Sequence, residues 1–516
     1  MLRTRTKAAL LSMVLLCSMA SMNPLRAQDS LSAFILTPKA GPEPHINGSK
    51  VFGVRPGHPI VFTIPVSGNK PVSISATDVP KGVKIDVHTG ALSGSIEKPG
   101  EYVLTIHAKN AMKEVTEKFT IVVGENIVLT PPMGWNSWNI YGTQVTQDLV
   151  LANAKAMVSS GLADHGWTYM NIDDAWQGSR GGPLNAIQPA SVTFPDVPQL
   201  SKEVHGLGLK LGIYSTPWVE SYGHHVGGSA MNPEGTFEKT RENIPRNKKM
   251  LPYAIGTYSF VSNDVKQYVQ WNIDYLKYDW NPNELPETKA MYDALRASGR
   301  DIALSLSNST PFASIGELSK VSNCWRTGGD IRDNWKSLKG RILTQDKWAP
   351  YAKPGHWNDP DMMVVGYVGW GKGPRPTQLT ADEQYTHVSA WCLMSVPLLL
   401  GCDLTKLDAF TISLLTNDEV LAVSQDPLGK QATLVAHEGE TGILAKDLSN
   451  GTKAAGLFNT SDSTQRMVLK WQDLGIQGKY IVRDIWRQKD LGSFTGEFAA
   501  EIPLHGVLML NLRKEK

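Results

Sequence analysis

Between residues 130 and 416, short apolar runs alternate with longer stretches in which apolar residues recur with helical periodicity. Alternating β-strand and α-helix units of this kind build parallel sheets. The apolar runs predict eight strands: Met133–Trp135, Tyr169–Ile172, Leu209–Tyr214, Tyr275–Tyr278, Ile302–Leu306, Val321–Trp325, His356–Trp357 and Leu398–Gly401. Eight such units favour a (β/α)8 TIM barrel. An open doubly wound sheet fits less well, because no glycine-rich phosphate loop follows the first strand.

Two flanking regions show a different pattern, in which short alternating segments are separated by Gly, Pro and Asn. A period of two predicts antiparallel strands that bury one face. The predicted strands are Val61–Val66, Val83–Val87, Tyr102–Ala108 and Val115–Val123 before the barrel, and Gly442–Lys446, Ala454–Asn459, Met467–Leu469, Tyr480–Ile485 and Val507–Leu512 after it. We therefore expect a multidomain chain, with a β-sandwich over 28–126, the barrel over 127–429 and an antiparallel β-sandwich over 430–516.

The segment VPKGVKIDVHTGALSGSIEKPGEYVLTIHAKN, residues 79–110, resembles the immunoglobulin-like modules of bacterial exported enzymes. The matching positions are Pro80, Gly82, Asp86, Thr89, Gly90, Gly94, Gly100 and Tyr102. The resemblance implies an immunoglobulin-like β-sandwich for this domain. We expect it to act as a spacer or a binding module, because no acid pair or metal-ligand cluster stands out in it.

Residues 1–27 have the pattern of a secretory signal peptide. Arg3, Arg5 and Lys7 form a positive region, and Ala8–Met19 is an apolar run too short to span a bilayer. Ala27 offers a small residue at which cleavage would occur. The pattern predicts a protein exported to the periplasm or secreted, and no later segment has the length of an apolar membrane span.

Charge and cysteine content narrow the function classes. With 51 basic and 49 acidic residues, the formal net charge is +2, which argues against a nucleic-acid or membrane-surface partner. Nothing in the sequence predicts an oligomeric state. Signal cleavage would leave Cys324, Cys392 and Cys402, an odd number that forms no complete disulfide framework. Each lies in an apolar stretch, so we expect buried, inert thiols.

Most of the predicted barrel strands end in polar or charged residues. These are Asp173, Asp174, Ser215, Asp279, Asn308, Arg326, Asp359 and Asp403. The catalytic residues of TIM barrels lie at the carboxyl-terminal ends of the strands. The fifteen tryptophans include several beside Asp or Asn, a combination suited to a carbohydrate site, although most of them are expected in the core.

The stretch YLKYDWN, residues 275–281, places Lys277 and Asp279 on one face of a strand, because strand side chains alternate. An adjacent ammonium favours the ionised carboxylate and orients it, as a covalent nucleophile requires. A buried salt bridge without catalytic function explains the same spacing and is the commoner case.

A second acid follows in CWRTGGDIRDNW, residues 324–335. Two glycines after Arg326 permit a tight loop that could bring Asp330 into a pocket. Asp330 could then protonate a leaving oxygen and later deprotonate water, and two carboxyl groups with such roles are the machinery of glycoside hydrolysis. Asp333 competes for this role, but we expect it in the first turn of the next helix, where acids cap.

Three further stretches suggest a sugar pocket. NIDDAW (171–176) supplies Asp173 and Asp174 for vicinal hydroxyls, GWNSW (134–138) supplies Trp138 as a wall, and HWNDPDMM (356–363) supplies Asp359 and Asp361. A catalytic metal is disfavoured. His224, His225 and His356 are present, but they show neither helical i, i+4 spacing nor a convincing ligand triad.

Taken in order, PPMGWNSW, NIDDAW, LKLGIY, LKYDWN, WRTGGDI and HWNDPDMM are similar to glycoside hydrolase family 27, the α-galactosidase and α-N-acetylgalactosaminidase group. SAWCLMSVPLLLGCDL and NDEVLAVSQDPLG match later landmarks of that family. The resemblance covers Val128 to Gly429 and the C-terminal sandwich. It implies hydrolysis of a carbohydrate with terminal α-galactosyl residues, retention of anomeric configuration, and no cofactor or metal.

By motif position, the resemblance makes Asp279 the nucleophile and Asp330 the general acid/base. It implies that Asp173 and Asp174 hold the O4 and O6 hydroxyls of galactose. The other implied sugar-binding residues are Trp138 and Tyr214 along the ring, Lys277 and Arg326 on hydroxyls and beside the acids, and Asp361 near the acid/base with Met362. Ala175 and Asn281 stand where many members have cysteines, so those disulfides are absent.

The stretch SLSNSTPF, residues 305–312, corresponds to the region around the C2 substituent of the sugar, with Asn308 as the implied contact. Its Asn308, Ser309 and Thr310 match neither the galactose nor the N-acetylgalactosamine pattern, and galactose is favoured. A β-L-arabinopyranosidase is a further alternative, against which the retention of both Asp173 and Asp174 argues. A lectin-like barrel is disfavoured because both candidate catalytic acids are present.

Overall fold

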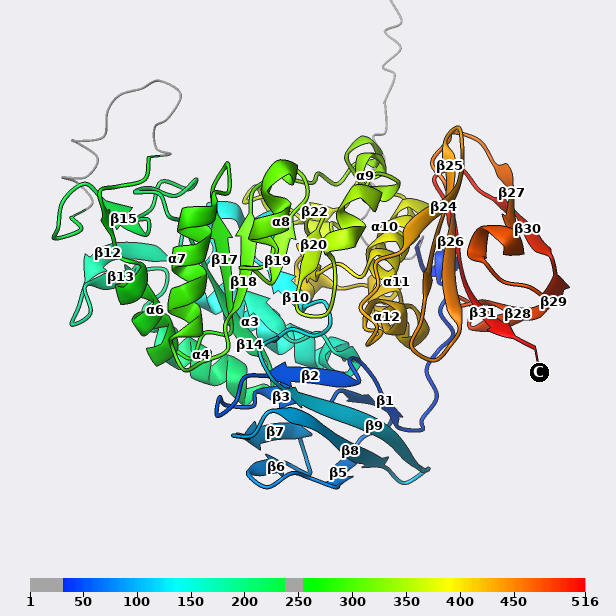
Figure 1. Ribbon diagram of the computed structural model, residues 1–516, viewed down its shortest axis with the longest axis horizontal. Coiled ribbons are helices and arrows are strands. Elements are labelled where there is room, and N and C mark those ends of the chain that lie inside the picture. The colour runs from blue at the N-terminus through cyan, green and yellow to red at the C-terminus, as the bar shows by residue number, and fades with distance from the viewer. Residues whose placement is uncertain (1–30, 237–253, 516) are drawn as a thin grey trace, which may run out of the picture.

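The computed structural model describes residues 31–236 and 254–515, which form three domains (Figure 1). The predicted signal peptide lies outside the described residues. The predicted architecture is confirmed: a parallel eight-stranded barrel stands between an immunoglobulin-like (Ig-like) domain and a C-terminal antiparallel β-sandwich. In Figure 1 the Ig-like domain lies below the barrel and the C-terminal sandwich lies beside it.

The barrel strands are β10 (Met133–Asn136), β11 (Tyr169–Asn171), β14 (Lys210–Ser215), β17 (Tyr275–Asp279), β18 (Ala303–Ser307), β19 (Cys324–Arg326), β20 (Trp357–Asp359) and β23 (Leu398–Leu400). They pair in the order β20-β19-β18-β17-β14-β11-β10-β23. A parallel bridge between Met363 and Leu400, with Met363 N donating to Leu399 O at 2.8 Å, closes the ring. All residues of β18 are buried, including Ser305 and Ser307, as expected for a strand of a parallel sheet covered on both faces.

Helices cover the outside of the barrel, and most of them bury apolar residues against it. They are α2 (Trp138–Tyr141), α3 (Gln147–Ser159), α4 (Val197–Gly206), α6 (Val261–Gln270), α7 (Leu285–Arg296), α8 (Ile315–Leu318), α9 (Trp335–Ile342), α10 (Ala381–Met394), α11 (Ala409–Leu415) and α12 (Asp418–Ser424). Helix α4 begins after Asp196, whose side chain accepts from Gln199 N. A capping box of Thr380 and Glu383 starts α10, which is buried almost all round between the barrel and the C-terminal sandwich.

Short two-stranded ribbons extend the loops of the barrel. They are β12 (Gln177–Gly181) with β13 (Ala186–Pro189), β15 (Ser229–Ala230) with β16 (Tyr258–Ser259), and β21 (Tyr367–Val368) with β22 (Arg375–Pro376). Within the described ranges, no helix is long and apolar enough to cross a membrane.

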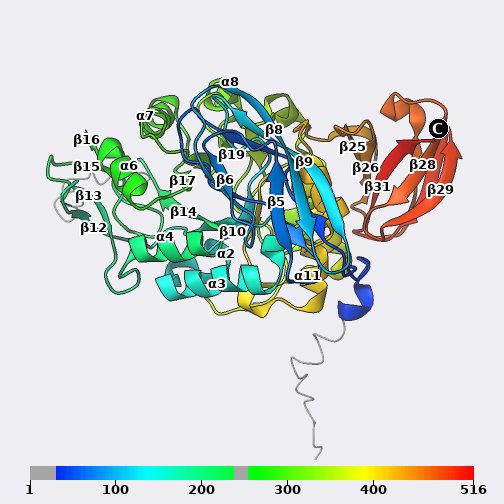
Figure 2. The same ribbon diagram turned by 90° about the horizontal axis from the view of Figure 1, so that it is seen from below.

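The Ig-like domain contains a four-stranded sheet of β2 (Val51–Val54), β9 (Glu114–Val123), β8 (Gly100–Lys109) and β5 (Ser73–Thr77), facing β3 (Phe62–Thr63), β7 (Ala91–Gly94) and β6 (Val83–Ile85). A further ribbon pairs β1 (His45–Ile46) with β4 (Val66–Ser67). Alternate residues of β8 and β9 are buried, and they form the core with Ile64, Ile74 and Leu92. Figure 2, a view from below, shows these strands against one end of the barrel.

Arg55 anchors the Ig-like domain to the barrel. Its side chain is buried, with Nε donating to Asp301 Oδ1 at 2.5 Å. The two remaining guanidinium nitrogens donate to the carbonyl oxygens of Arg296 and Arg300, each at 2.7 Å. Because Asp301 and Arg300 lie just before β18, the Ig-like domain covers the amino-terminal ends of the barrel strands.

The C-terminal domain consists of the sheet β24 (Thr433–Glu438), β25 (Thr441–Asp447), β26 (Lys453–Asn459), β31 (Val507–Lys514), β28 (Lys479–Asp484) and β29 (Lys489–Thr495), with the ribbon β27 (Gln465–Lys470) and β30 (Glu497–Ile502). Trp486 joins this domain to the barrel, because its Nε1 donates to Ser389 Oγ of α10 at 2.8 Å.

The structure differs from the sequence-based expectation at the strand ends. Ser215, Asp279, Arg326 and Asp359 are the last residues of their strands and not the first residues after them. Parallel pairing depends on the backbone, so a polar side chain does not end a strand that its neighbour continues. The three cysteines of the described ranges are buried and free, as expected, and burial raises the pKa of Cys392 and Cys402 to about 12.

Candidate active site

The polar residues predicted at the strand ends gather at the carboxyl-terminal end of the barrel. Parallel pairing sets Tyr214 beside Lys277, Asp279 beside Ser307, and Arg326 beside Asp359. The Ig-like domain lies against the opposite end, so it does not cover these side chains. This arrangement is that of TIM-barrel active sites in general.

Asp279 is buried at the end of β17. Its carboxylate lies near Lys277, whose Nζ is 3.8 Å from Asp279 Oδ2. Within the described part of the chain, no hydrogen-bond donor reaches Asp279 Oδ1. Burial raises the pKa of Asp279 to about 7, although the positive charge of Lys277 opposes the shift. One buried carboxylate oxygen is therefore left without an internal hydrogen-bond donor.

Lys277 has a closer partner than Asp279. Its Nζ donates to Asp173 Oδ2 at 2.7 Å, which is 1.1 Å shorter than the 3.8 Å to Asp279. Burial would lower the pKa of Lys277, but the charges of Asp173 and Asp279 raise it above its usual value, so the side chain is cationic. The Lys-x-Asp spacing thus does not form a tight, self-contained salt bridge, which weakens the purely structural interpretation of that motif.

The second candidate acid, Asp330, is held by Arg326. The guanidinium Nη2 of Arg326 lies 3.3 Å from Asp330 Oδ1 and 2.9 Å from Asp361 Oδ2. The Asp330 side chain is 45% exposed, whereas those of Arg326 and Asp361 are almost fully buried. Partial burial would raise the pKa of Asp330, but the charges of Arg326 and Lys277 lower it below its usual value.

Asp330 and Asp279 lie close enough to act on each other. The negative charge of Asp330 contributes to the raised pKa of Asp279. Two carboxyl groups that interact in this way share protons, and their apparent pKa values belong to the pair. One of them is enclosed and the other is reachable from solvent, which suits a nucleophile and a proton donor to a departing group.

Asp174 is fixed by two main-chain donors and one side-chain donor. Its Oδ1 accepts from Ala175 N at 2.8 Å and from Gln177 Nε2 at 3.1 Å, and its Oδ2 accepts from Gly223 N at 2.6 Å. A Cβ atom at position 223 would lie only 2.9 Å from Asp174 Oδ2, so this close approach requires glycine. The loop after β14 thereby holds Asp174 beside Asp173.

Two aromatic side chains contact this group. Trp138, the first residue of α2, packs against a buried cluster that includes Met362 and Tyr275. Tyr214 is 1% exposed, its ring centroid lies 5.6 Å from Lys277 Nζ, and its hydroxyl has no hydrogen-bond partner among the described residues. Burial and the charge of Asp279 raise the pKa of Tyr214, so the hydroxyl is neutral and can donate to a ligand.

The region predicted around the sugar C2 substituent follows β18. Asn308 is half-buried, and its N–H donates to Trp280 O at 3.2 Å. Thr310 is buried, and its hydroxyl donates to Asn283 Oδ1 at 2.8 Å. Thr310 is thus held by an internal partner, which leaves Asn308 and Ser309 as the better candidates to face the sugar.

Asp361 has a supporting position. It is 2% exposed, and its Oδ2 accepts from Ile331 N at 2.7 Å in addition to binding Arg326. The backbone of Asp361 is left-handed, with φ 98°, and its N–H donates to Asp359 Oδ1 at 2.8 Å. Asp361 therefore holds both Arg326 and the loop that carries Asp330, which the sequence indicated only as a position near the acid/base.

The expectation that Asp333 lies in the first turn of the next helix is wrong. Helix α9 begins at Trp335, and Asn334 is its cap, accepting from Ser337 N at 3.0 Å. Asp333 is buried and forms two hydrogen bonds with Arg375, of 2.6 and 3.0 Å. A distant cation is a stronger partner for a buried carboxylate than a helix terminus, and sequence spacing does not reveal it.

Several residues that shape the site could not be recognised from the sequence. Gln177 and Gly223 hold Asp174, and Ser307 Oγ accepts from Arg326 Nη1 at 3.4 Å. Gln177 follows Asp174 by three residues, but a lone Gln carries no recognisable motif. Among the described residues, no group of three or more His, Cys, Asp and Glu side chains is placed to hold a metal ion.

Comparisons with known proteins assign the chain to a family. The model of the family described as Alpha galactosidase A matches residues 130–231 and 247–426. The Alpha galactosidase C-terminal beta sandwich domain matches 438–512, and an Ig domain model matches 43–124. This chain belongs to the alpha galactosidase A family. It is therefore a glycoside hydrolase, as the sequence motifs predicted.

Three relatives illustrate the match. A "Probable alpha-galactosidase" of Dictyostelium discoideum is 36% identical over 402 residues, 75% of this chain and 93% of the relative. The crystal structure of an alpha-galactosidase homologue from Bacteroides fragilis NCTC 9343 superimposes with a TM-score of 0.80. That protein is 30% identical in sequence, and the match covers 92% of this chain and 98% of the other. A β-L-arabinopyranosidase from Geobacillus stearothermophilus is 28% identical with a TM-score of 0.64, over 74% and 96% of the two chains.

Proposed function

We propose that this protein is a retaining exo-α-galactosidase that releases terminal α-linked galactose from oligo- or polysaccharides. The observation that carries the proposal is the pair Asp279 and Asp330. Asp279 is a buried carboxylate with one oxygen that accepts no hydrogen bond from the described residues, and Asp330 is a partly exposed acid within its electrostatic reach. Family membership supports the same substrate class.

In the first step, the ionised Asp279 attacks the anomeric carbon. A bond forms between its Oδ and that carbon while the bond to the glycosidic oxygen breaks, and Asp330 gives its proton to the departing oxygen. In the second step, Asp330 removes a proton from water, and the resulting hydroxide attacks the anomeric carbon. Galactose leaves with its configuration retained, Asp279 is released as carboxylate, and Asp330 is protonated again.

The remaining residues hold the sugar in this geometry. Asp173 and Asp174 accept hydrogen bonds from the O4 and O6 hydroxyls, while the Tyr214 hydroxyl and Lys277 donate to the same ring. Trp138 lines the pocket, and Asn308 faces C2. Arg326 binds a hydroxyl and sets the charge around Asp330. Asp361 acts through Arg326 and the Ile331 main chain more than through direct contact with sugar. None of these roles requires a cofactor.

Two other sugars compete with galactose as the substrate: L-arabinopyranose, which differs at C6, and N-acetylgalactosamine, which differs at C2. A β-L-arabinopyranosidase of this fold is related to the chain, and that sugar is galactose without its C6 arm. Both Asp173 and Asp174 are retained and firmly fixed, which favours a sugar with an O6 hydroxyl to bind. An acetamido group at C2 would need room beside Asn308 and Ser309.

Hydrolysis of p-nitrophenyl α-galactoside, the N-acetyl-α-galactosaminide and the β-L-arabinopyranoside tests the proposal. We expect the galactoside to be the best substrate and Asp279→Asn to abolish its hydrolysis. Asp330→Asn should reduce the activity on galactosides with a sugar leaving group, such as melibiose, by about 10²–10⁴-fold. The rate of the first step should fall less on p-nitrophenyl substrates, because p-nitrophenolate leaves without a proton. Asp148→Asn, on the exposed first turn of α3, is the matched control.

Equal activity of Asp279→Asn and wild type would refute the assignment of the nucleophile. No release from any of the three glycosides would refute the proposed function and favour a binding protein.

We also propose export of the mature protein after cleavage near Ala27. The charged and apolar pattern of residues 1–27 supports this proposal. Amino-terminal sequencing of the protein from the extracytoplasmic fraction should begin near Gln28, and a chain that retains Met1 there would refute cleavage.

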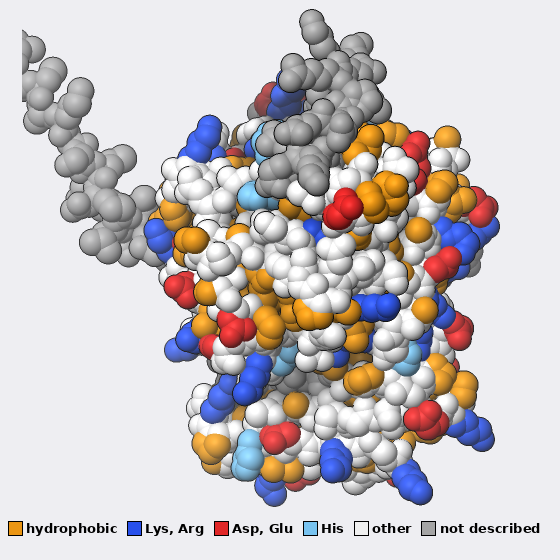
Figure 3. All heavy atoms as spheres, turned by 90° about the vertical axis from the view of Figure 1, so that its left-hand side faces the viewer, with side chains coloured by type: hydrophobic (Ala, Val, Ile, Leu, Met, Phe, Trp, Pro, Cys, Tyr) orange, Lys and Arg blue, Asp and Glu red, His pale blue; other side chains and the backbone are white. Residues whose placement is uncertain are grey.

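The protein surface also fits a carbohydrate partner. Basic and acidic side chains are mixed on the face in Figure 3, which favours a carbohydrate over a nucleic acid as the partner.

A further inference from the structure

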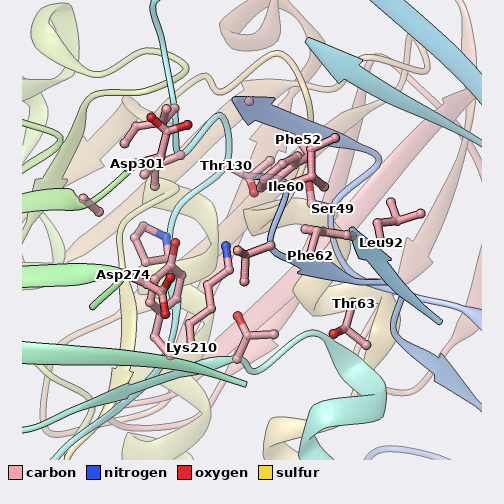
Figure 4. A pocket seen from close by; sticks show the side chains of 18 of the residues that line it. Ser49, Phe52, Ile60, Phe62, Thr63, Leu92, Thr130, Lys210, Asp274 and Asp301 are labelled. Carbon is pink, nitrogen blue, oxygen red and sulfur yellow. The ribbon is translucent and has the colours of Figure 1, made fainter. Parts of the chain in front are cut away.

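A cavity of about 390 Å³ lies between the Ig-like domain and the amino-terminal end of the barrel. One wall comes from β2, β3 and β7 of the Ig-like domain, and the other from the residues that begin β11, β14 and β18. A cavity of this size at a domain boundary is typical of small-molecule sites. We call this space the interdomain crevice. Figure 4 shows it from close by.

The interdomain crevice is separate from the active site. Lys210, which lines it, is the first residue of β14, and Tyr214 of the active site lies four residues further along the same strand. At the rise of a parallel strand, these two residues are about 13 Å apart. A ligand in the crevice would not touch the catalytic acids.

Most of the charged groups that line the crevice are already paired. Asp274 binds Arg300 and His205, with His205 Nε2 at 2.7 Å from its Oδ2. Asp301 binds Arg55 and also His58, whose Nδ1 lies 3.0 Å from its Oδ1. Each carboxylate therefore already has a cationic partner in direct contact.

Lys210 is the exception. No hydrogen bond or ion pair involves its Nζ in the described ranges of the chain, although the carboxylates of Asp274 and Asp301 also line the crevice. The ammonium lies 5.3 Å from the ring centroid of Phe52 and 5.1 Å from that of Tyr169. Figure 4 shows the Lys210 side chain extending from the barrel toward the Ig-like domain. The crevice thus contains one ammonium that no carboxylate of the described residues contacts directly, although the charges of Asp274 and Asp301 act on it.

The rest of the lining is apolar and partly aromatic. Phe52 and Phe62 form one wall, with ring centroids 5.1 Å apart, and Ile60 and Leu92 continue it. Flat apolar surfaces next to a lone ammonium are complementary to a ligand that joins a ring to a negative group.

We propose that the interdomain crevice binds a small organic monoanion with an apolar ring, of which an aromatic carboxylate is the simplest example. Lys210 binds the negative group, and Phe52 and Phe62 contact the ring. The ligand touches both domains, so it favours the state in which the Ig-like domain is docked on the barrel. This site does not depend on the proposed glycosidase activity.

The test is calorimetric titration of the mature protein with 2-naphthoate, whose carboxylate and fused rings serve as the probe. The neutral isostere 2-naphthamide is titrated in parallel. We expect one equivalent of 2-naphthoate to bind and 2-naphthamide to bind at least tenfold more weakly. Lys210→Met keeps the apolar stem but removes the charge, and it should weaken 2-naphthoate binding at least tenfold without changing the affinity for the amide.

Lys202→Met, on the exposed face of α4, is the matched control and should bind 2-naphthoate as wild type does. Phe52→Leu tests the location of the ring and should also weaken binding. If Lys210→Met does not fold, wild type and Phe52→Leu still decide the outcome. The proposal is overturned if 2-naphthoate does not bind, if it binds no better than 2-naphthamide, or if neither the Lys210 nor the Phe52 variant weakens it.

Discussion

Replacing Lys277 by methionine should move the alkaline limb of the pH–activity profile upward. In the wild-type protein, Asp279 and Asp330 together hold one proton in the active form, because the nucleophile is ionised and the acid is protonated. In the free protein the pKa of Asp279 is raised to about 7 and that of Asp330 is lowered, so the single proton of the pair rests mainly on Asp279, must lie on Asp330 in the reactive form, and is lost near pH 7. Wild-type kcat/KM should therefore fall as the pH rises through 7.

The size of the effect follows from the Lys277–Asp279 distance. Two unit charges 3.8 Å apart interact by about 4 kcal/mol at an effective dielectric constant of 20. Since one pKa unit corresponds to about 1.4 kcal/mol, the loss of Lys277 should raise the pKa of Asp279 by about one to three units. The negative charge of Asp173, released from its partner, pushes in the same direction.

The assay is kcat/KM for p-nitrophenyl α-galactoside between about pH 4 and pH 10, measured in stopped aliquots. Lys277 also contacts the sugar in the proposed site, so the absolute rate should fall, but the position of the limb does not depend on that loss. Lys202→Met should keep the wild-type limb. An unchanged or lowered limb in Lys277→Met would refute the reasoning, because it would show that Lys277 does not act on the titrating pair.

Three other substitutions have defined outcomes. Tyr214→Phe removes a buried hydroxyl without a partner in the described chain, so it should raise the urea midpoint, stabilising by about 1 kcal/mol, while it lowers kcat/KM. Arg55→Met leaves the half-buried Asp301 without its main cation and should destabilise the docked Ig-like domain by about 3 kcal/mol in thermal unfolding. Burial lowers the pKa of Lys446 from 10.5 to about 7 in the folded state. As the pH rises, the folded state therefore loses this proton at a lower pH than the unfolded state does. The destabilisation by Lys446 is therefore complete below pH 7, and the stability difference between Lys446→Met and wild type should fall by about 1.4 kcal/mol per unit from pH 7 to pH 10. Wild-type midpoints in Tyr214→Phe or Arg55→Met, or a pH-independent difference for Lys446→Met, would contradict these assignments.

The barrel could be predicted from sequence because its strands are buried on both faces and read as short apolar runs. The same logic located Asp279 and Arg326, since polar residues at the ends of such runs collect at one end of the barrel. The Ig-like and C-terminal domains were predictable from period-two alternation. These features depend on local pattern, which a single sequence contains.

Features that depend on pairing between distant segments could not be predicted. The contact of Lys277 with Asp173 joins side chains 104 residues apart, and that of Asp333 with Arg375 spans 42 residues. Arg55, which anchors the Ig-like domain, has no distinguishing neighbours in the sequence. Lys210 likewise reads as an ordinary residue at the start of a strand, and only the docking of two domains encloses it.

The assignment of the nucleophile is tested most directly by trapping the covalent intermediate. The ring fluorine of a 5-fluoro-α-galactosyl fluoride slows both steps, because both transition states are positively charged, but the good fluoride leaving group speeds the first step, so the glycosyl-enzyme should accumulate. Mass spectrometry of the digested protein should then locate one galactosyl adduct on Asp279, and Asp279→Asn should carry none. An adduct on another carboxylate, or inactivation without any adduct, would contradict the proposed mechanism.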